Sequence, residues 1–224
     1  MRSTLTRLVT FLLLVVPGIV VADEPAVSPH AKWEKAIAAF EQKDAAQMPP
    51  KQGIVFVGSS SIVGWKLEDY FSKLPVIKRG FGGSQLADSV YFAPRIVTKY
   101  EPKTVVLYAG DNDLSAGKSP EQVAADFDAF VKVVHDKLPK TKIIFIAVKP
   151  SIARWKLIDK VRATNKLIAD ACAKDDQRLV FLDIAPLMLK DDGQPNPELF
   201  VKDGLHMSPL GYERWSDLLR PHLE

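Results

Sequence analysis

The chain has 224 residues, of which 47% are hydrophobic and 25% are charged, and its formal net charge is +3. This composition is typical of a globular protein and excludes a fibrous or intrinsically disordered chain. The small net charge excludes the basic stripe that a nucleic-acid-binding protein needs, so we expect no nucleic-acid partner. The length suits one domain with a substantial core.

The first 22 residues are typical of a signal peptide. Arg2 and Arg7 precede an apolar stretch over residues 8–21, which ends at Ala22. The stretch is too short for a comfortable membrane span, which takes about 20 residues. We therefore expect an exported protein, periplasmic or secreted, with no stable membrane span after removal of residues 1–22. An uncleaved N-terminal anchor is the alternative. Removal would leave residues 23–224 as a single domain of formal charge +1, because the segment holds two arginines and no acidic residue.

Apolar spacing predicts a short helix over residues 32–42, because Trp33, Ala36, Ile37 and Phe40 share one face. Five apolar runs follow that are typical of strands buried on both sides. They cover residues 54–57, 76–77, 104–108, 142–148 and 179–182.

Helical periods alternate with these runs. Ser119 and Pro120 predict the start of one helix, which Pro139 ends. A second predicted helix covers residues 156–174, and a last one begins after Ser208. The alternation predicts an α/β fold, a three-layer α/β/α sandwich with a five-stranded parallel sheet in the flavodoxin-like order 2-1-3-4-5. Cys172 is the only cysteine, so no internal disulfide forms, and we expect it to be a small core residue.

Ligands of such sheets bind beyond the carboxyl ends of the strands. The segments at that edge are "GSSS" (58–61), "RGFGGS" (79–84), "AGDND" (109–113) and, before the last helix, "DGLH" (203–206). Each alone is an ordinary turn or helix cap. Together they supply a nucleophile, oxyanion donors and an acid–base pair at one edge of the sheet.

The residue types point to nucleophilic catalysis. A serine hydroxyl needs a base to take its proton, and a histidine such as His206 serves at neutral pH. Asp203, three residues earlier, can accept the imidazole N–H and fix its tautomer. The residues alone leave the choice among Ser59, Ser60 and Ser61 open.

The four segments resemble the signature blocks of the SGNH (GDSL-type) hydrolases, over a motif-bearing core of about residues 53–222. The resemblance implies Ser60 as nucleophile, Asp203 and His206 as its partners, and an oxyanion hole of the Ser60 and Gly83 backbone N–H groups with the Asn112 amide. It implies an exported serine esterase that hydrolyses acyl or acetyl esters of lipid, aryl or carbohydrate alcohols. No metal or cofactor is called for.

The chain departs from that pattern in the nucleophile block. Ser59 stands where the family usually has aspartate, and Ser61 stands where it has leucine. The aspartate is not a member of the catalytic triad, so its loss need not abolish activity.

Several side chains near the strand ends are candidates for substrate contact, with core packing or plain solvation as the alternative. The aromatic candidates are Trp65, Phe81, Tyr108 and Trp155, and the basic ones, for an anionic or sugar substrate, are Lys149, Arg154 and Lys202.

Two other functions stay open. One is a metal-dependent phosphohydrolase that uses Asp111, Asp113 and His206 as ligands, although these are few ligands for a hard cation. The other is a non-catalytic binding module on the same fold. Acyl length, the alcohol moiety and the oligomeric state are not predicted.

Overall fold

A computed structural model describes residues 28–223 of the chain. The predicted signal peptide and the start of the predicted domain therefore lie outside the described residues. Within the described part, no helix combines the length and the apolar content needed to cross a bilayer.

A five-stranded, all-parallel sheet in the order β2-β1-β3-β4-β5 forms the centre of the protein, which confirms the predicted order. Its strands are β1 (Ile54–Gly58), β2 (Val76–Gly80), β3 (Thr104–Tyr108), β4 (Lys142–Ile146) and β5 (Leu179–Leu182). The second strand runs three residues beyond its apolar run. The fourth ends two residues before its run does, because the Val148 N–H leaves the sheet and bonds to Asn165 Oδ1 at 2.8 Å.

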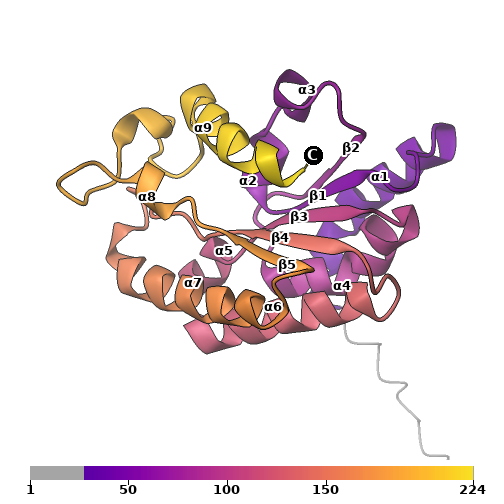
Figure 1. Ribbon diagram of the computed structural model, residues 1–224, viewed down its shortest axis with the longest axis horizontal. Coiled ribbons are helices and arrows are strands. Elements are labelled where there is room, and N and C mark those ends of the chain that lie inside the picture. The colour runs from indigo at the N-terminus through magenta and orange to yellow at the C-terminus, as the bar shows by residue number, and fades with distance from the viewer. Residues whose placement is uncertain (1–27, 224) are drawn as a thin grey trace, which may run out of the picture.

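Helices cover both faces of the sheet and complete the predicted three-layer sandwich (Figure 1). One face carries α1 (Glu34–Ala46), α4 (Leu86–Ile96), α6 (Pro120–His135) and α7 (Ile158–Cys172). The other carries α2 (Ser60–Gly64), α3 (Leu67–Tyr70), α8 (Ala185–Met188) and α9 (Pro209–Leu219), while α5 (Asp111–Ser115) follows β3. Short 3₁₀ helices are η1 (Ala31–Trp33), η2 (Thr98–Tyr100), η3 (Trp155–Leu157), η4 (Ala173–Asp175), η5 (Pro197–Leu199) and η6 (Arg220–His222).

The alternation of side chains along β1 explains why its apolar run is unbroken. Val55 and Val57 join the core under α4, α6 and α7, whereas Ile54 and Phe56 join the core under α2 and α9. Successive residues of a strand point to opposite faces, so a strand covered on both sides needs apolar residues throughout.

The observed first residues of the helices agree better with the predicted ones than the observed last residues do. The Ser119 side chain caps α6 and accepts from the Gln122 N–H at 3.2 Å, but this helix stops at His135. Helix α4 has no counterpart among the predicted helices. Its buried apolar residues Leu86, Phe92, Ala93 and Ile96 fall at helical spacing, but it also contains Pro94, a residue that usually ends a helix.

Candidate active site

Ser60 begins α2, immediately beyond the carboxyl end of β1. The chain turns at Gly58, whose φ is +135°. A Cβ atom on Gly58 would lie 1.9 Å from the Tyr108 carbonyl oxygen, so only glycine fits between β1 and β3 here. The strand therefore leads directly into a turn that sets Ser60 at the edge of the sheet.

The three consecutive serines have different surroundings. Ser60 is partly exposed, and its Oγ lies 3.0 Å from His206 Nε2. Ser61 is buried and its Oγ accepts from the Lys149 ammonium at 3.2 Å. Ser59 is also buried, and its Oγ has no hydrogen-bond partner within residues 28–223. Of the three hydroxyls, that of Ser60 is therefore the one that lies against the histidine.

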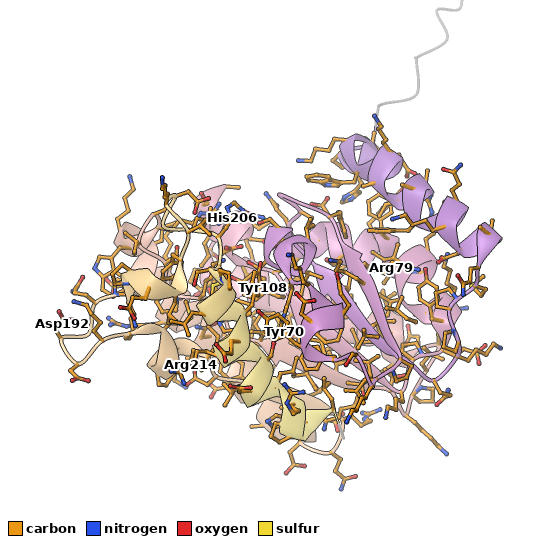
Figure 2. All side chains as sticks on the ribbon, turned by 90° about the horizontal axis from the view of Figure 1, so that it is seen from above. Tyr70, Arg79, Tyr108, Asp192, His206 and Arg214 are labelled. Atoms are coloured by element: carbon orange, nitrogen blue, oxygen red, sulfur yellow. The ribbon has the colours of Figure 1, made fainter. Side chains whose placement is uncertain are left out.

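His206 lies on the loop before α9 (Figure 2). Its ring links Ser60 to Asp203. Its Nδ1 lies 2.6 Å from Asp203 Oδ2. Asp203 Oδ1 accepts from the backbone N–H groups of Leu205 and His206 at 2.8 and 2.9 Å. The hydrogen bond from the His206 ring and these two backbone bonds lower the pKa of Asp203 to about 2. The carboxylate is thus ionised and held facing the imidazole.

The predicted oxyanion donors lie around Ser60. A Cβ atom on Gly82 would lie 3.9 Å from Ser60 Cβ, and the next residue, Gly83, has φ +75°. None of the described residues accepts a hydrogen bond from the backbone N–H of Ser60 or Gly83. The Asn112 Nδ2 donates to the carbonyl oxygen of Ser84, the residue after Gly83, at 2.9 Å. This bond ties the Asn112 amide to the glycine turn.

Trp33 also belongs to this region, although the sequence placed it only on a helix face. Its ring would lie 3.3 Å from a Cβ atom on Gly83, and it packs edge-on against Phe81. The 3₁₀ helix that ends at Trp33 therefore packs against the glycine turn. No motif signals this contact in the sequence.

A charged network lies beneath the site. The buried Lys149 ammonium donates to Tyr108 OH at 2.9 Å and to Asp111 Oδ2 at 2.8 Å. Arg154 Nη1 lies 3.3 Å from the same Asp111 oxygen. Burial opposes ionisation of Asp111, but the Lys149 and Arg154 cations hold the pKa of its carboxyl below the usual range. The only hint of this network in the sequence was that charged residues follow two neighbouring strands.

Most candidates for substrate contact prove to be core residues. Trp65 and Phe81 are 0% and 2% exposed, so neither presents a surface to a substrate. Trp65 packs against the rings of Phe56 and Tyr212 in the core. Tyr108 and Lys149 are buried too, whereas Lys202 is exposed.

Trp155 alone of the aromatic candidates stays partly exposed. It lines a hollow of about 380 Å³ with Ile152, Gln194 and Pro197. The hollow adjoins the histidine loop, because the Ala153 N–H next to Ile152 donates to the Gly204 carbonyl at 3.0 Å.

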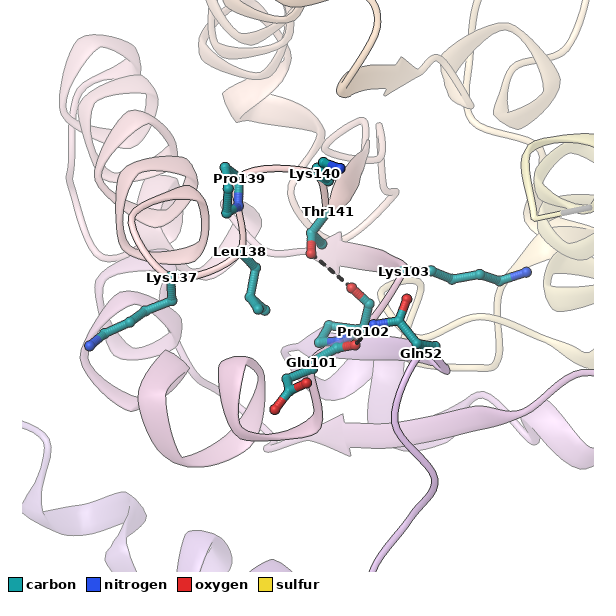
Figure 3. A pocket seen from close by; sticks show the side chains of 9 residues that line it. All are labelled: Gln52, Glu101, Pro102, Lys103, Lys137, Leu138, Pro139, Lys140 and Thr141. Atoms are coloured by element: carbon teal, nitrogen blue, oxygen red, sulfur yellow. Dashed lines mark hydrogen bonds between the residues drawn. The ribbon is translucent and has the colours of Figure 1, made fainter.

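Another cavity, of about 320 Å³, lies at the opposite edge of the sheet (Figure 3). It is lined by Gln52 and by the segments 101–103 and 137–141, which precede β3 and β4. Its position at the amino ends of the strands separates it from Ser60.

The aspartates of the alternative metal site are engaged elsewhere. Asp111 pairs with Lys149, and the fully buried Asp113 binds the Lys118 ammonium at 2.8 Å and the Leu86 N–H at 3.1 Å. Among residues 28–223, no three histidine, cysteine or acidic side chains are grouped as ligands of one ion. The described residues therefore give the phosphohydrolase hypothesis no ligand set.

Comparison with known proteins adds independent findings. Residues 56–214 match the GDSL-like lipase/acylhydrolase family. The platelet-activating factor acetylhydrolase IB subunit alpha1 of Bos taurus is 28% identical over 167 residues, 71% of this chain and 69% of that protein. The isoamyl acetate-hydrolyzing esterase 1 homolog of Rattus norvegicus is 29% identical over 164 residues, 63% of this chain and 65% of that protein. The structure of a GDSL-like lipase from Bacteroides thetaiotaomicron is similar in fold, with a TM-score of 0.70 and 22% identity over 84% of this chain and 96% of that one.

Proposed function

Because the chain belongs to the GDSL-like lipase/acylhydrolase family, a family of hydrolases, we propose that it is a serine esterase whose nucleophile is Ser60. The observation that carries the proposal is the continuous chain of hydrogen bonds from Ser60 Oγ through the His206 ring to the Asp203 carboxylate. These three side chains stand in the relation that a nucleophile, its general base and the group that orients the base require.

The reaction starts when Ser60 Oγ attacks the ester carbonyl carbon and its proton passes to His206 Nε2. His206 then gives the proton to the departing alcohol oxygen, which leaves an acyl group on Ser60. Water, deprotonated by the same nitrogen, releases the carboxylic acid and restores the serine. The ionised Asp203 stabilises the imidazolium that forms in both halves.

The negative charge of each tetrahedral intermediate falls on the former carbonyl oxygen. The backbone N–H groups of Ser60 and Gly83 and the Asn112 amide are the donors that would receive it. Donors fixed before the reaction stabilise this charge more than they stabilise the neutral ester, which lowers the barrier.

We propose esters of short acyl groups as substrates. Both curated relatives named above are described as hydrolysing acetyl compounds. The alcohol half must lie on the His206 side, because this residue protonates its oxygen. The hollow lined by Trp155 adjoins the His206 loop and offers an aromatic surface for that half, whether aryl, lipid or carbohydrate.

We also propose that the protein is exported. The basic and apolar pattern of residues 1–22 supports this. The exported chain would depend on packing alone for its stability, because Cys172 is its only cysteine. Expression with and without residues 1–22, followed by fractionation and mass determination of the mature chain, tests it.

A chain-length series of p-nitrophenyl esters tests the esterase proposal. We expect turnover to be highest with acetate and to fall with longer chains. Ser60→Ala should abolish turnover, whereas Ser59→Ala and Ser61→Ala should retain activity. Undiminished turnover in Ser60→Ala would refute the assignment, and an inactive wild type that binds esters would favour the binding module.

A further inference from the structure

Asn112 carries the only side-chain donor of the proposed oxyanion hole, and its usefulness depends on which way its amide faces. The carbonyl oxygen of Ser84 can only accept, and it receives the Nδ2 hydrogen at 2.9 Å. The Arg154 guanidinium can only donate, and its Nη2 donates to Asn112 Oδ1 at 2.9 Å. A flipped amide would set donor against donor and acceptor against acceptor, so the two partners fix its orientation.

This orientation leaves one amide hydrogen for the substrate. Nδ2 carries two hydrogens, and within residues 28–223 only the Ser84 carbonyl accepts from it. The second hydrogen is therefore available to a developing oxyanion.

Arg154 is itself held in place. Its side chain is 19% exposed, and its Nη1 lies 3.3 Å from Asp111 Oδ2. Lys149, which is 1% exposed, occupies the same carboxylate oxygen at 2.8 Å. Two cations thus face one carboxylate, and the excess positive charge lies against the amide of Asn112. A cation bonded to an amide oxygen polarises the amide and strengthens its N–H as a donor.

We propose that Arg154 is a positioning residue of the oxyanion hole, which locks the Asn112 amide with its donor toward the substrate and polarises it as negative charge develops. The inference rests on the proposed esterase function. Arg154 acts through Asn112 and touches no reacting atom. Its contribution grows as the carbonyl oxygen becomes negative, so it raises kcat and leaves KM little changed.

A double-mutant cycle between Arg154 and Asn112 tests this, with p-nitrophenyl acetate as substrate. Loss of one oxyanion donor costs about 10²–10³ in kcat, so we expect that for Asn112→Ala. We expect Arg154→Met to lower kcat by about 10- to 100-fold, because Asn112 then keeps only its bond to Ser84 and loses the cation that polarises its amide. In the Asn112→Ala background, Arg154→Met should change kcat by less than about threefold, because interacting residues are not additive.

Arg162→Met is the matched control. Arg162 lies on α7, is 62% exposed and pairs only with Asp159 among the described residues, so its loss should leave kcat unchanged. Thermal melting establishes that each variant is folded, and Arg154→Gln replaces Arg154→Met in the cycle if the latter does not fold.

Three results overturn the proposal. They are a wild-type value of kcat in the Arg154 variant, a rise in KM that accounts for the whole loss of kcat/KM, and an equal loss in both Asn112 backgrounds. Failure of the esterase function is distinguishable, because wild type and Ser60→Ala would then be equally inactive.

Discussion

Replacement of Asp203 by asparagine exchanges one carboxylate oxygen for an NH₂ group and should disable the histidine. Asp203 Oδ1 accepts two backbone N–H groups at 2.8 and 2.9 Å, and Oδ2 accepts from His206 Nδ1 at 2.6 Å. An asparagine keeps both backbone bonds only if its oxygen stays at the Oδ1 position. Its NH₂ group then faces His206 Nδ1, which must accept, so the ring proton moves to Nε2. Nε2 can no longer take the proton of Ser60.

The size of the expected loss of kcat depends on how deeply the Asp203 and His206 side chains are buried. A wrong tautomer in a buried serine triad costs about 10⁴ in kcat. The Asp203 and His206 side chains are 47% and 42% exposed here, so water can partly replace the carboxylate. We therefore expect a loss of about 10²–10⁴ in kcat, which is about 3–5 kcal/mol of transition-state stabilisation.

The assay is kcat with p-nitrophenyl acetate, beside a thermal melt of each variant. Asp183→Asn is the control, because Asp183 is also exposed and accepts a backbone N–H at 3.0 Å, that of Ala185, but makes no hydrogen bond to His206. We expect it to keep the kcat of the wild type. A folded Asp203→Asn variant within tenfold of the wild-type kcat would refute the role given to the carboxylate.

Three further predictions concern stability, thiol chemistry and substrate contact. Asp44 is 3% exposed and binds Arg79, Lys99 and Tyr100. Asp44→Ala should lower the free energy of unfolding in urea by about 3–5 kcal/mol, because the buried Arg79 guanidinium loses its partner. Burial opposes ionisation of Asp44, but its partners lower its pKa on balance. The difference in unfolding free energy between the wild type and Asp44→Ala should therefore have its full value above the unfolded pKa of about 3.9 and shrink as the pH falls further. A difference that does not change with pH would contradict this. Burial raises the pKa of the Cys172 thiol to about 12, so Ellman's reagent should label it only in the unfolded chain, and rapid labelling of the folded protein would disprove its burial. Trp155→Ala should raise KM for aryl acetates several-fold with little change in kcat, and an unchanged KM would remove the hollow from the substrate site.

The sheet could be predicted from the sequence because strands covered on both faces need apolar residues at nearly every position. Val55 and Phe56 serve opposite cores, so both must be apolar and the run is unbroken. Helix α4 was not predicted although its apolar residues follow helical spacing, because it contains Pro94, a residue that usually ends a helix. Its inner face includes Asp88, which is held by His30 at 2.7 Å, a residue far away in sequence.

The sequence was enough to predict the residues of the candidate site, but not the residues that pack against them and hold them in place. Ser60 and His206 lie 146 positions apart, yet both sit at the carboxyl edge of the sheet, where parallel topology brings strand ends together. Lys149 and Arg154 look like solvated residues in the sequence. Their burial depends on how the segment after β4 folds back over the end of β3, and no local pattern encodes that. The same limit made Trp65 a candidate for substrate contact although it fills the core.

Covalent labelling of the nucleophile tests the central claim most directly. The wild-type protein is treated with a fluorophosphonate, digested and analysed by mass spectrometry, in parallel with Ser60→Ala. We expect one adduct on the wild type, on the hydroxyl of Ser60, together with loss of esterase activity, and no adduct on the alanine variant. An adduct on Ser59 or Ser61, or esterase activity that survives complete labelling of Ser60, would contradict the assignment.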